Sequence, residues 1–221
     1  MCGRYTLSVP AETLAQHFGL ETVPDVAPRF NIAPTQAAPV VRLSVEREAP
    51  VLDFLRWGLV PSWAKDASAA GRLINARSET AAEKPSFRSA MRHRRCLVPA
   101  DGFYEWRAEG GAKQPYRIAR PDGAPIAFAG LWERWGKGDE PLETFTILTT
   151  AANATLAPLH DRMPVILDPA DYALWLDPTA SDVALVEPLL RAAPEGALTY
   201  YAVSRAVNRV GHDDASLVVA L

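Results

Sequence analysis

The sequence predicts an α+β protein, with an antiparallel β-sheet or barrel-like core and short helices inserted between the strands. Short apolar segments rich in β-branched residues recur along the chain, and 19 prolines spread over it punctuate many short elements. No linker, repeat or low-complexity segment divides the chain. With 221 residues, of which 48% are hydrophobic, it can bury a sizeable core, and we expect a single domain over residues 1–221.

The expected helices are short, and most are delimited by a cap or a proline. Gly19 is a C-cap for the first helix, and Ser86 is a candidate cap for the second. Asp168 and Pro169 provide an N-cap and a first-turn proline for the third, whereas Pro188 interrupts and weakens the fourth. The helices are expected over Pro10–Phe18, Ser86–Met91, Asp168–Leu176 and Val183–Leu190.

The expected strands are apolar, β-branched or aromatic segments. Pro99 is expected to separate two of them. The turn Pro121-Asp122-Gly123 is expected to join two others, Tyr116–Ala119 and Ile126–Leu131, into a hairpin. The remaining strands are expected over Ala38–Val45, Val51–Trp57, Arg95–Val98, Gly102–Trp106, Thr144–Thr150 and Thr199–Val203.

Charge and cysteine content limit the possible partners. The formal net charge is −3, without the basic excess of a broad polyanion-binding surface, so any nucleic-acid contact needs a local arginine cluster. Two cysteines cannot form a disulfide framework, and this low count favours a reducing, cytoplasmic location. Cys96 lies in an apolar run and is expected to be a buried small hydrophobe. We find no membrane-spanning run and no signal peptide, and expect a monomer without membrane contact.

Cys2 is the most informative residue. If Met1 is removed, Cys2 carries a thiol and a free α-amine on adjacent carbons. The amine has a pKa of about 7.7–8.0, so part of it is a neutral nucleophile near neutral pH. It can condense with an aldehyde to an imine, on which the thiol closes to a five-membered thiazolidine. The alternative is a disordered residue at the chain end.

Four segments are dense in functional residue types: Met1–Tyr5 around Cys2, Asn75–Thr80, Asp101–Trp106 and His160–Pro164. Each has a structural alternative. Asn75 could instead be a turn residue, and Glu105 could be an outward-facing residue of a strand. His160 could be a histidine of a loop or a helix end. No single spacing among them is diagnostic.

Six segments in order resemble the SOS response-associated peptidase family, also called SRAP or abasic-site processing proteins. The resemblance extends from residue 2 to about Val203, and the following Ser204–Asn208 is similar too. The six segments are Met1–Tyr5, Arg29–Pro34, Trp57–Trp63, Asn75–Thr80, Cys96–Trp106 and His160–Leu167. The resemblance implies an SRAP-like fold, loss of Met1, and covalent linkage of Cys2 to abasic sites in single-stranded DNA.

The matched motifs contain Cys2, Asn75, Glu105 and His160, and side-chain chemistry gives each an expected role. Cys2 supplies the amine and the thiol. Glu105 accepts and returns protons, and its pKa should rise if the neighbouring aromatic residues exclude water. His160 donates to the sugar oxygen as the ring opens. The Asn75 amide donates to a developing oxyanion or positions the N-terminus.

The expected DNA contacts are arginines and one tryptophan. Arg4, Arg77 and Arg162 each follow a proposed catalytic residue by two positions, and guanidinium groups bind phosphates bidentately. Trp63, in a loop-like segment, is expected to stack on a base or to hold the strand bent, with a packed core position as the alternative. Asn31 and Thr149 are expected as secondary contacts.

Neither a metal nor a cofactor is expected. The four histidines have no CxxC or HxxxH partners, and there is no glycine-rich nucleotide loop. Removal of Met1 is either autocatalytic, by attack of the Cys2 thiol, or the work of an aminopeptidase. Two other functions remain open: a cysteine N-terminal-nucleophile peptidase or amidase acting on other molecules, and a non-catalytic β-barrel that binds nucleic acid.

Overall fold

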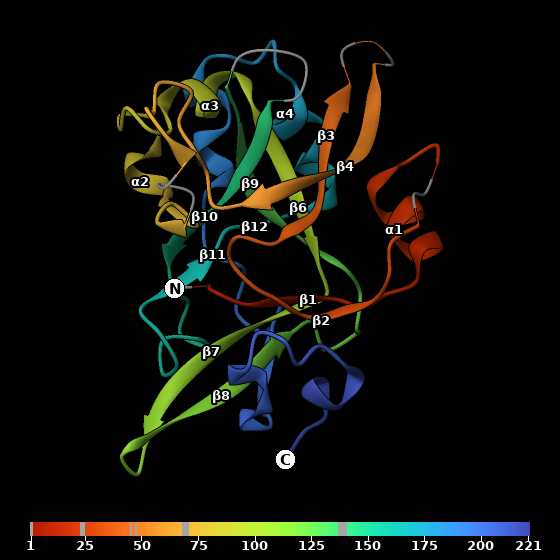
Figure 1. The fold of residues 1–221 in the computed structure, drawn as a ribbon, viewed down its shortest axis with the longest axis vertical. Helices are drawn as coiled ribbons and strands as arrows, with labels where there is room; N and C mark the ends of the chain where they lie inside the picture. The colour runs from red at the N-terminus through yellow and green to blue at the C-terminus, as the bar shows by residue number, and fades with distance from the viewer. Residues whose placement is uncertain (1, 23–24, 45, 47, 68–70, 137–140) are drawn as a thin grey trace.

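Two β-sheets form the framework of the protein, and short helices lie around them (Figure 1). The computed structural model describes residues 2–22, 25–44, 46, 48–67, 71–136 and 141–221. The predicted α+β class, with a barrel-like β core and short inserted helices, is confirmed.

The first sheet has five antiparallel strands in the order β13-β8-β7-β1-β2. Its strands are β1 (Tyr5–Leu7), β2 (Arg29–Ile32), β7 (Gly102–Glu109), β8 (Ala112–Ala119) and β13 (Thr199–Ala202). β7 and β8 form a hairpin that turns through Gly110 and Gly111, with φ angles of 55° and 82°. Two successive positive φ angles suit the right-handed twist of a hairpin, and glycine adopts them without steric cost.

The second sheet closes on itself. β10 pairs with β4 on one side and with β9 on the other, so that β10, β4, β3, β6 and β9 form a ring. The ring strands are β3 (Ala37–Ser44), β4 (Ala49–Trp57), β6 (Arg95–Ala100), β9 (Ile126–Trp135) and β10 (Leu142–Ala151). Shorter strands extend it: β5 (Asn75–Arg77), β11 (Arg162–Pro164) and β12 (Ile166–Leu167).

The helices are short, as expected. α1 ends at Gly19, whose φ of 63° is the left-handed C-cap that the sequence predicts. Asp168 caps the third expected helix by accepting from Ala170 N at 2.9 Å, but that helix begins as a 3₁₀ turn. The helices are α1 (Ala11–Phe18), α2 (Ser78–Ala81), α3 (Arg88–His93) and α4 (Tyr172–Leu176), with 3₁₀ turns η2 (Pro169–Asp171), η3 (Val183–Leu185), η4 (Glu187–Leu189), η5 (Arg205–Asn208) and η6 (Ala215–Val218).

Three local expectations are wrong. α3 begins at Arg88 after Phe87, so Ser86 does not cap it. Pro99 does not separate two strands but lies inside β6, where it pairs with Ala127 of β9. On the other side of β6, β3 pairs with it only at Val41 and Leu97. Pro99 therefore has no neighbouring strand on that side, and its missing N–H costs no hydrogen bond between strands. The fourth expected helix is two 3₁₀ turns separated at Val186.

The expected hairpin of Tyr116–Ala119 with Ile126–Leu131 is also wrong. β8 pairs with β7 and β13, whereas β9 pairs with β6, β10 and β12 in the other sheet. Gly123 does take up a turn conformation, with a φ of 70°, but the turn leads from one sheet to the other. The Gly110-Gly111 turn, which the sequence interpretation missed, forms the hairpin instead.

One large apolar cluster runs across both sheets and contains Cys2 and Cys96, both fully buried, as expected for Cys96. A smaller cluster of Tyr104, Val203, Val207 and Leu217 joins β7 to the C-terminal segment. Among the described residues, no helix combines the length and the apolar character that a membrane crossing requires.

Candidate functional site

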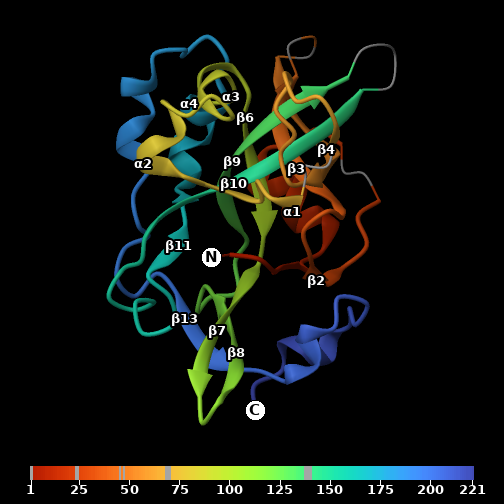
Figure 2. The ribbon, with the colours of Figure 1, turned by 60° about the vertical axis from the view of Figure 1, so that its left-hand side comes forward.

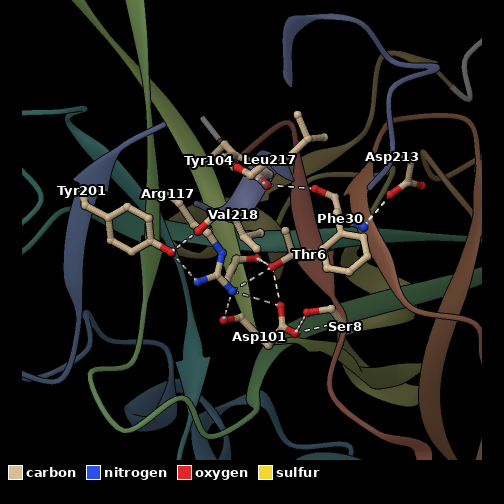
Figure 3. Close-up of polar contacts among 11 residues, drawn as sticks. Thr6, Ser8, Phe30, Asp101, Tyr104, Arg117, Tyr201, Asp213, Leu217 and Val218 are labelled. Carbon is tan, nitrogen blue, oxygen red and sulfur yellow. Dashed lines mark hydrogen bonds and ion pairs between the residues drawn. The ribbon is translucent and has the colours of Figure 1, made fainter. Parts of the chain in front are cut away.

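The N-terminal segment lies beside β7, and a buried ionic network fixes its position (Figure 3). Asp101, only 4% exposed, accepts from Thr6 Oγ1 and, at 2.6 Å each, from the amide and hydroxyl of Ser8. Arg117 donates to the Asp101 carbonyl at 3.0 Å and pairs with its carboxylate. A Cβ on Gly102 would lie 2.9 Å from the backbone carbonyl oxygen of Ile118, which cannot move aside as a flexible side chain can, so a glycine is required there. The end of β1 is thereby held against the start of β7.

This register directs Cys2 toward Glu105. Tyr5 pairs with Phe103, and Tyr104 N donates to Arg4 O at 3.0 Å, so the residues before β1 continue along β7. Cys2 is 0% exposed, which is unusual for the second residue of a chain. Burial raises the pKa of the Cys2 thiol, and the nearby Glu105 carboxylate raises it further. The sulfur is therefore held as a neutral thiol.

Asn75 reaches the same residue from the barrel. It begins β5, which runs parallel to β10 with Asn75 opposite Ile147. Its Nδ2 donates to the Cys2 carbonyl oxygen at 2.8 Å. A carbonyl oxygen only accepts, so this contact fixes which end of the amide faces Cys2. Asn75 Oδ1 is buried and has no hydrogen-bond donor among the described residues, so an acceptor is left beside the N-terminal residue.

Glu105 is 5% exposed, on β7 opposite Tyr116 of β8. Burial raises the pKa of its carboxyl group, while the electrostatic influence of His160 acts in the opposite direction. The predicted direction of this pKa shift is confirmed. A carboxyl group whose pKa is raised and which lies close to a thiol is suited to proton transfer.

His160 lies just before β11, and its Nδ1 has two competing contacts. Arg162 N donates to Nδ1 at 2.9 Å, which places the ring proton on Nε2. Asp161 Oδ1 lies 2.7 Å from the same Nδ1, a contact that is favourable only when Nδ1 carries a proton. One nitrogen cannot donate and accept at once, so the contact that is made depends on whether Nδ1 carries the ring proton.

Arg162 joins β10, β11 and α2. Its guanidinium pairs bidentately with Glu79, at 2.6 and 2.8 Å, and donates to Thr149 O at 2.5 Å. The hydrogen bond from Arg162 holds the pKa of Glu79 below its usual value. Thr149 is fully buried and lies opposite Arg77 in the pairing of β10 with β5. The sequence interpretation did not identify Glu79 as the partner of this arginine.

Arg77 and Trp63 lie at the surface. Trp63 is 65% exposed and donates weakly to Pro85 O at 3.4 Å, so the core alternative for Trp63 does not hold. Arg77 is exposed at the end of β5, where α2 begins. Arg77 also lowers the pKa of Glu79, after the larger effect of Arg162, so the two arginines flank one carboxylate.

Arg4 and Asn31 form a separate cluster with the C-terminal segment. Arg4 Nη1 donates to Asn31 Oδ1 at 2.9 Å and to Val207 O at 2.8 Å. Asn31 is 0% exposed, and its Nδ2 donates to Val207, Arg209 and His212 carbonyl oxygens at 2.7–3.1 Å. The structure therefore brings Cys2, Asn75, Glu105 and His160 together with Arg162 and Arg77, but directs Arg4 and Asn31 toward the C-terminal segment. Only the similarity of Ser204–Asn208 to the family hinted at that segment.

A surface hollow opens at the catalytic candidates. Its lining residues are Glu105, Trp106, Lys113, His160 and Asn208. Within the described ranges, no group of three or more His, Cys, Asp or Glu side chains is placed to hold a metal ion, and a metal-free site stays a prediction.

Comparison with known proteins identifies the family. The family model described as SOS response associated peptidase (SRAP) matches residues 1–210. The chain belongs to this family. Among SRAP relatives, the abasic site processing protein YoqW of Bacillus subtilis is 38% identical, with 99% of each chain covered. YedK of Escherichia coli, also an abasic site processing protein, is 36% identical over 99% of each chain.

Longer relatives and solved structures agree. The abasic site processing protein HMCES of Gallus gallus is 33% identical; the alignment covers all of this chain and 78% of HMCES. A crystal structure from Bacteroides thetaiotaomicron matches over the full length of both chains with a TM-score of 0.86 and 28% identity. A phage-related protein from Bordetella bronchiseptica matches with a TM-score of 0.73 and 33% identity, covering 92% of this chain and 95% of that one.

Proposed function

We propose that this SRAP protein captures abasic sites in single-stranded DNA covalently, through a thiazolidine formed by Cys2. The observation that carries the proposal is the convergence of distant segments on a buried Cys2. Asn75 donates to its carbonyl oxygen at 2.8 Å, and Glu105 acts electrostatically on its thiol. The names of YoqW, YedK and HMCES, all abasic site processing proteins, support this choice of substrate.

The chemistry requires the amine to react before the thiol. The open form of an abasic sugar carries an aldehyde at C1′, and the α-amine of Cys2 adds to it with loss of water to give an imine. The thiol then adds across the C=N bond, so that the new C–S bond forms at C1′ and the thiol proton passes to the nitrogen. The raised pKa of the Cys2 thiol keeps it protonated until the positive charge of a protonated imine favours the thiolate.

Three neighbouring residues would manage protons and position. Glu105 takes a proton from the α-ammonium group and returns it during dehydration or ring opening. His160, whose Nδ1 lies beside Arg162 N and Asp161, donates to the sugar oxygen as the sugar opens. The unsatisfied Asn75 Oδ1 is an acceptor for the freed amine of Cys2, which would then be held at both its nitrogen and its carbonyl oxygen.

DNA contacts would come mainly from the surface next to β5 and β11. The exposed Arg77 and Trp63 are suited to contact a phosphate and a base face, respectively. Arg162, held by Glu79, would contact the backbone of the strand near the sugar, whereas Thr149 is fully buried and would support that surface only through the hydrogen bond that its carbonyl oxygen accepts from Arg162. Arg4 and Asn31 would contribute through the shape of the N-terminal strand, because their hydrogen bonds to each other and to the C-terminal segment are directed inward.

Removal of Met1 is part of the proposal. Met1 lies outside the described residues. The cluster of Cys2, Asn75, Glu105 and His160 also suits an autopeptidase-type cysteine hydrolase, in which the thiol attacks the preceding carbonyl. Cellular aminopeptidase is the other route. Release of the captured DNA through ring opening would give a lyase-like, reversible reaction.

A denaturing gel tests the proposal. A slowly migrating adduct is expected with abasic single-stranded DNA, and none with intact single strands or with an abasic site inside a duplex. Turnover of an amide substrate without adduct would favour the second candidate, an N-terminal-nucleophile peptidase or amidase acting on other molecules. Salt-sensitive binding without adduct would favour a non-catalytic nucleic-acid-binding barrel.

We further infer that residues 1–221 act as one SRAP-like domain, because one apolar cluster extends across both sheets. The chain would act as a monomer in the cytoplasm, where the thiols of Cys2 and Cys96, both free, stay reduced.

A further inference from the structure

The hollow beside the catalytic candidates contains three side chains that the proposed chemistry does not use. Glu105 and His160 form one part of its lining, and Trp106, Lys113 and Asn208 form the rest. These three come from β7, from β8 and from the end of η5, so the C-terminal segment completes the hollow. It is therefore a continuation of the site and not a separate cavity.

Trp106 is held in place by Asn208. The indole Nε1 donates to Asn208 Oδ1 at 2.8 Å, and the Trp106 ring contacts Tyr104 at 6.4 Å between centroids. An indole N–H only donates, so this bond fixes the amide orientation and leaves Asn208 Nδ2 as a donor at an exposed position. A half-buried aromatic ring with a fixed orientation and an adjacent amide donor suits a nucleobase or a sugar face.

Lys113 adds a positive charge. It is exposed, and among the described residues no carboxylate lies within ion-pair distance of it. Lysine near an aromatic ring and an amide is a common combination for contacts to the phosphate and base of a single strand. The hollow therefore complements an anionic nucleotide beside the reacting sugar.

These residues lie across the site from Trp63 and Arg77. β11, which follows His160, lies between α2 and the β7–β8 hairpin in both views (Figures 1 and 2). Arg77 immediately precedes α2, and Trp63 donates to Pro85 O just after it. Trp106 and Lys113 belong to the hairpin on the other side.

We propose that Trp106, Lys113 and Asn208 form a second nucleotide subsite, which binds the nucleotide attached to the abasic sugar on the side away from Trp63. This inference rests on the proposed function. The strand enters beside Trp63 and Arg77, places the abasic sugar at Cys2, and leaves over the hollow. There Lys113 pairs with a phosphate, Trp106 contacts the base or sugar face, and Asn208 Nδ2 donates to an acceptor on the nucleotide.

One-sided substrates test the proposal. Two sets of oligonucleotides are needed. In one set the abasic site is at the 5′ end, so that nucleotides are attached only on its 3′ side; in the other set it is at the 3′ end, so that nucleotides are attached only on its 5′ side. The rate of adduct formation is measured against DNA concentration, giving a half-saturating concentration and a maximal rate. Lys113→Ala should raise the half-saturating DNA concentration for one set only. It should also reduce by about 1 the slope of the logarithm of the binding constant against the logarithm of the salt concentration. Trp63→Ala should affect the other set.

Matched variants separate contact from folding. Lys113→Arg keeps the charge and should retain wild-type affinity. Asn208→Asp keeps the acceptor for the Trp106 indole but places a carboxylate beside a phosphate, so it should weaken the same set as Lys113→Ala. Thermal unfolding should be unchanged in Lys113→Ala, because Lys113 is exposed and forms no ion pair with the described residues.

The outcomes separate the two proposals. If the wild-type protein forms no adduct with any abasic strand, the proposed function fails. If it forms adducts, but Lys113→Ala and Trp63→Ala affect the same set, or Lys113→Ala affects neither, the second subsite is refuted and the capture function stands.

Discussion

Replacing Glu105 with glutamine should slow abasic-site capture far more than it weakens DNA binding. Glu105 is 5% exposed on β7, beside the Cys2 thiol, and burial raises the pKa of its carboxyl group. Glutamine keeps the size and one acceptor but cannot carry a proton. Loss of general acid–base catalysis typically costs a factor of about 10²–10⁴, equivalent to about 3–5 kcal/mol of barrier.

The pH dependence gives the prediction its sign. The wild-type capture rate should rise as Glu105 ionises, in a range above the ordinary glutamate pKa because burial has raised it. In Glu105→Gln this rise should be absent. Reversal should slow as well, because ring opening uses the same proton path backwards. His160→Ala should share the defect, and the double variant should be less than additive if both residues serve one relay.

The same substitution should stabilise the fold at high pH. A group whose pKa is higher in the folded state than in the unfolded state stabilises the fold fully at pH values below its unfolded-state pKa. This contribution to the free energy of unfolding is lost as the pH rises through the folded-state pKa. The wild-type protein should therefore lose stability relative to Glu105→Gln as the pH increases above the normal glutamate range, whereas the two should be similar in acid. Melting temperatures across that range measure this difference.

Single-turnover time courses on denaturing gels, with release to a trap strand, provide the kinetic assay. Binding to an intact single strand serves as the control and should be nearly unchanged. Wild-type rates in both directions for Glu105→Gln would refute the reasoning and leave Glu105 as a buried structural carboxylate.

Three further predictions follow from the contacts of the site. Cys2→Ala should abolish the adduct and Cys2→Ser should give none that survives denaturation, because only a thiol closes the stable ring; a normal yield from Cys2→Ala on the gel would rule out the mechanism. Arg77→Ala and Arg162→Ala should each weaken DNA binding about equally for any base sequence and make the affinity less dependent on salt concentration. Only Arg162→Ala should also lower the melting temperature, since it breaks the ion pair with Glu79. Loss of the reaction with a small aldehyde, with DNA affinity intact, would instead assign these arginines to the chemical step. Asn31→Ala should cost about 1–3 kcal/mol in the free energy of unfolding, measured by denaturant titration, because it removes the hydrogen bonds from a buried amide to the Val207, Arg209 and His212 carbonyl oxygens and takes away an acceptor of Arg4 Nη1; an unchanged value would show that water replaces the amide.

Local chemistry was predictable from the sequence. The cap at Gly19, the cap at Asp168 and the apolar strands of the barrel depend on a few consecutive residues, and the structure confirms them. The choice of Cys2, Asn75, Glu105 and His160 as one cluster came from motif resemblance and side-chain chemistry, and stays a prediction until their roles are measured. The sequence predicted a raised pKa for Glu105 only if its aromatic neighbours excluded water and left an outward position on a strand as the alternative; the structure shows that the residue is buried.

Short strands were less predictable. β1, β5 and β11, which carry or adjoin the catalytic candidates, have three residues each. Three residues give too little periodicity to distinguish a strand from a loop, and each of these strands exists because a longer neighbour supplies its hydrogen bonds. The expected hairpin of β8 with β9 failed for a related reason, since a turn signal does not determine which sheet its flanking strands join.

By itself, the sequence determined the chemistry that these residues are able to perform: an aminothiol at position 2, with a carboxylate, an imidazole and an amide elsewhere in the chain. Only the tertiary structure decided which of them lie together. It directed Arg4 and Asn31 to a C-terminal segment that begins 176 residues after Asn31, and it gave Arg162 its partner Glu79. It also formed a hollow that Trp106 and Asn208 line together with Glu105 and His160. Side-chain type is local information, whereas burial and hydrogen-bond partners depend on packing between residues far apart in the chain, which no short stretch of sequence contains.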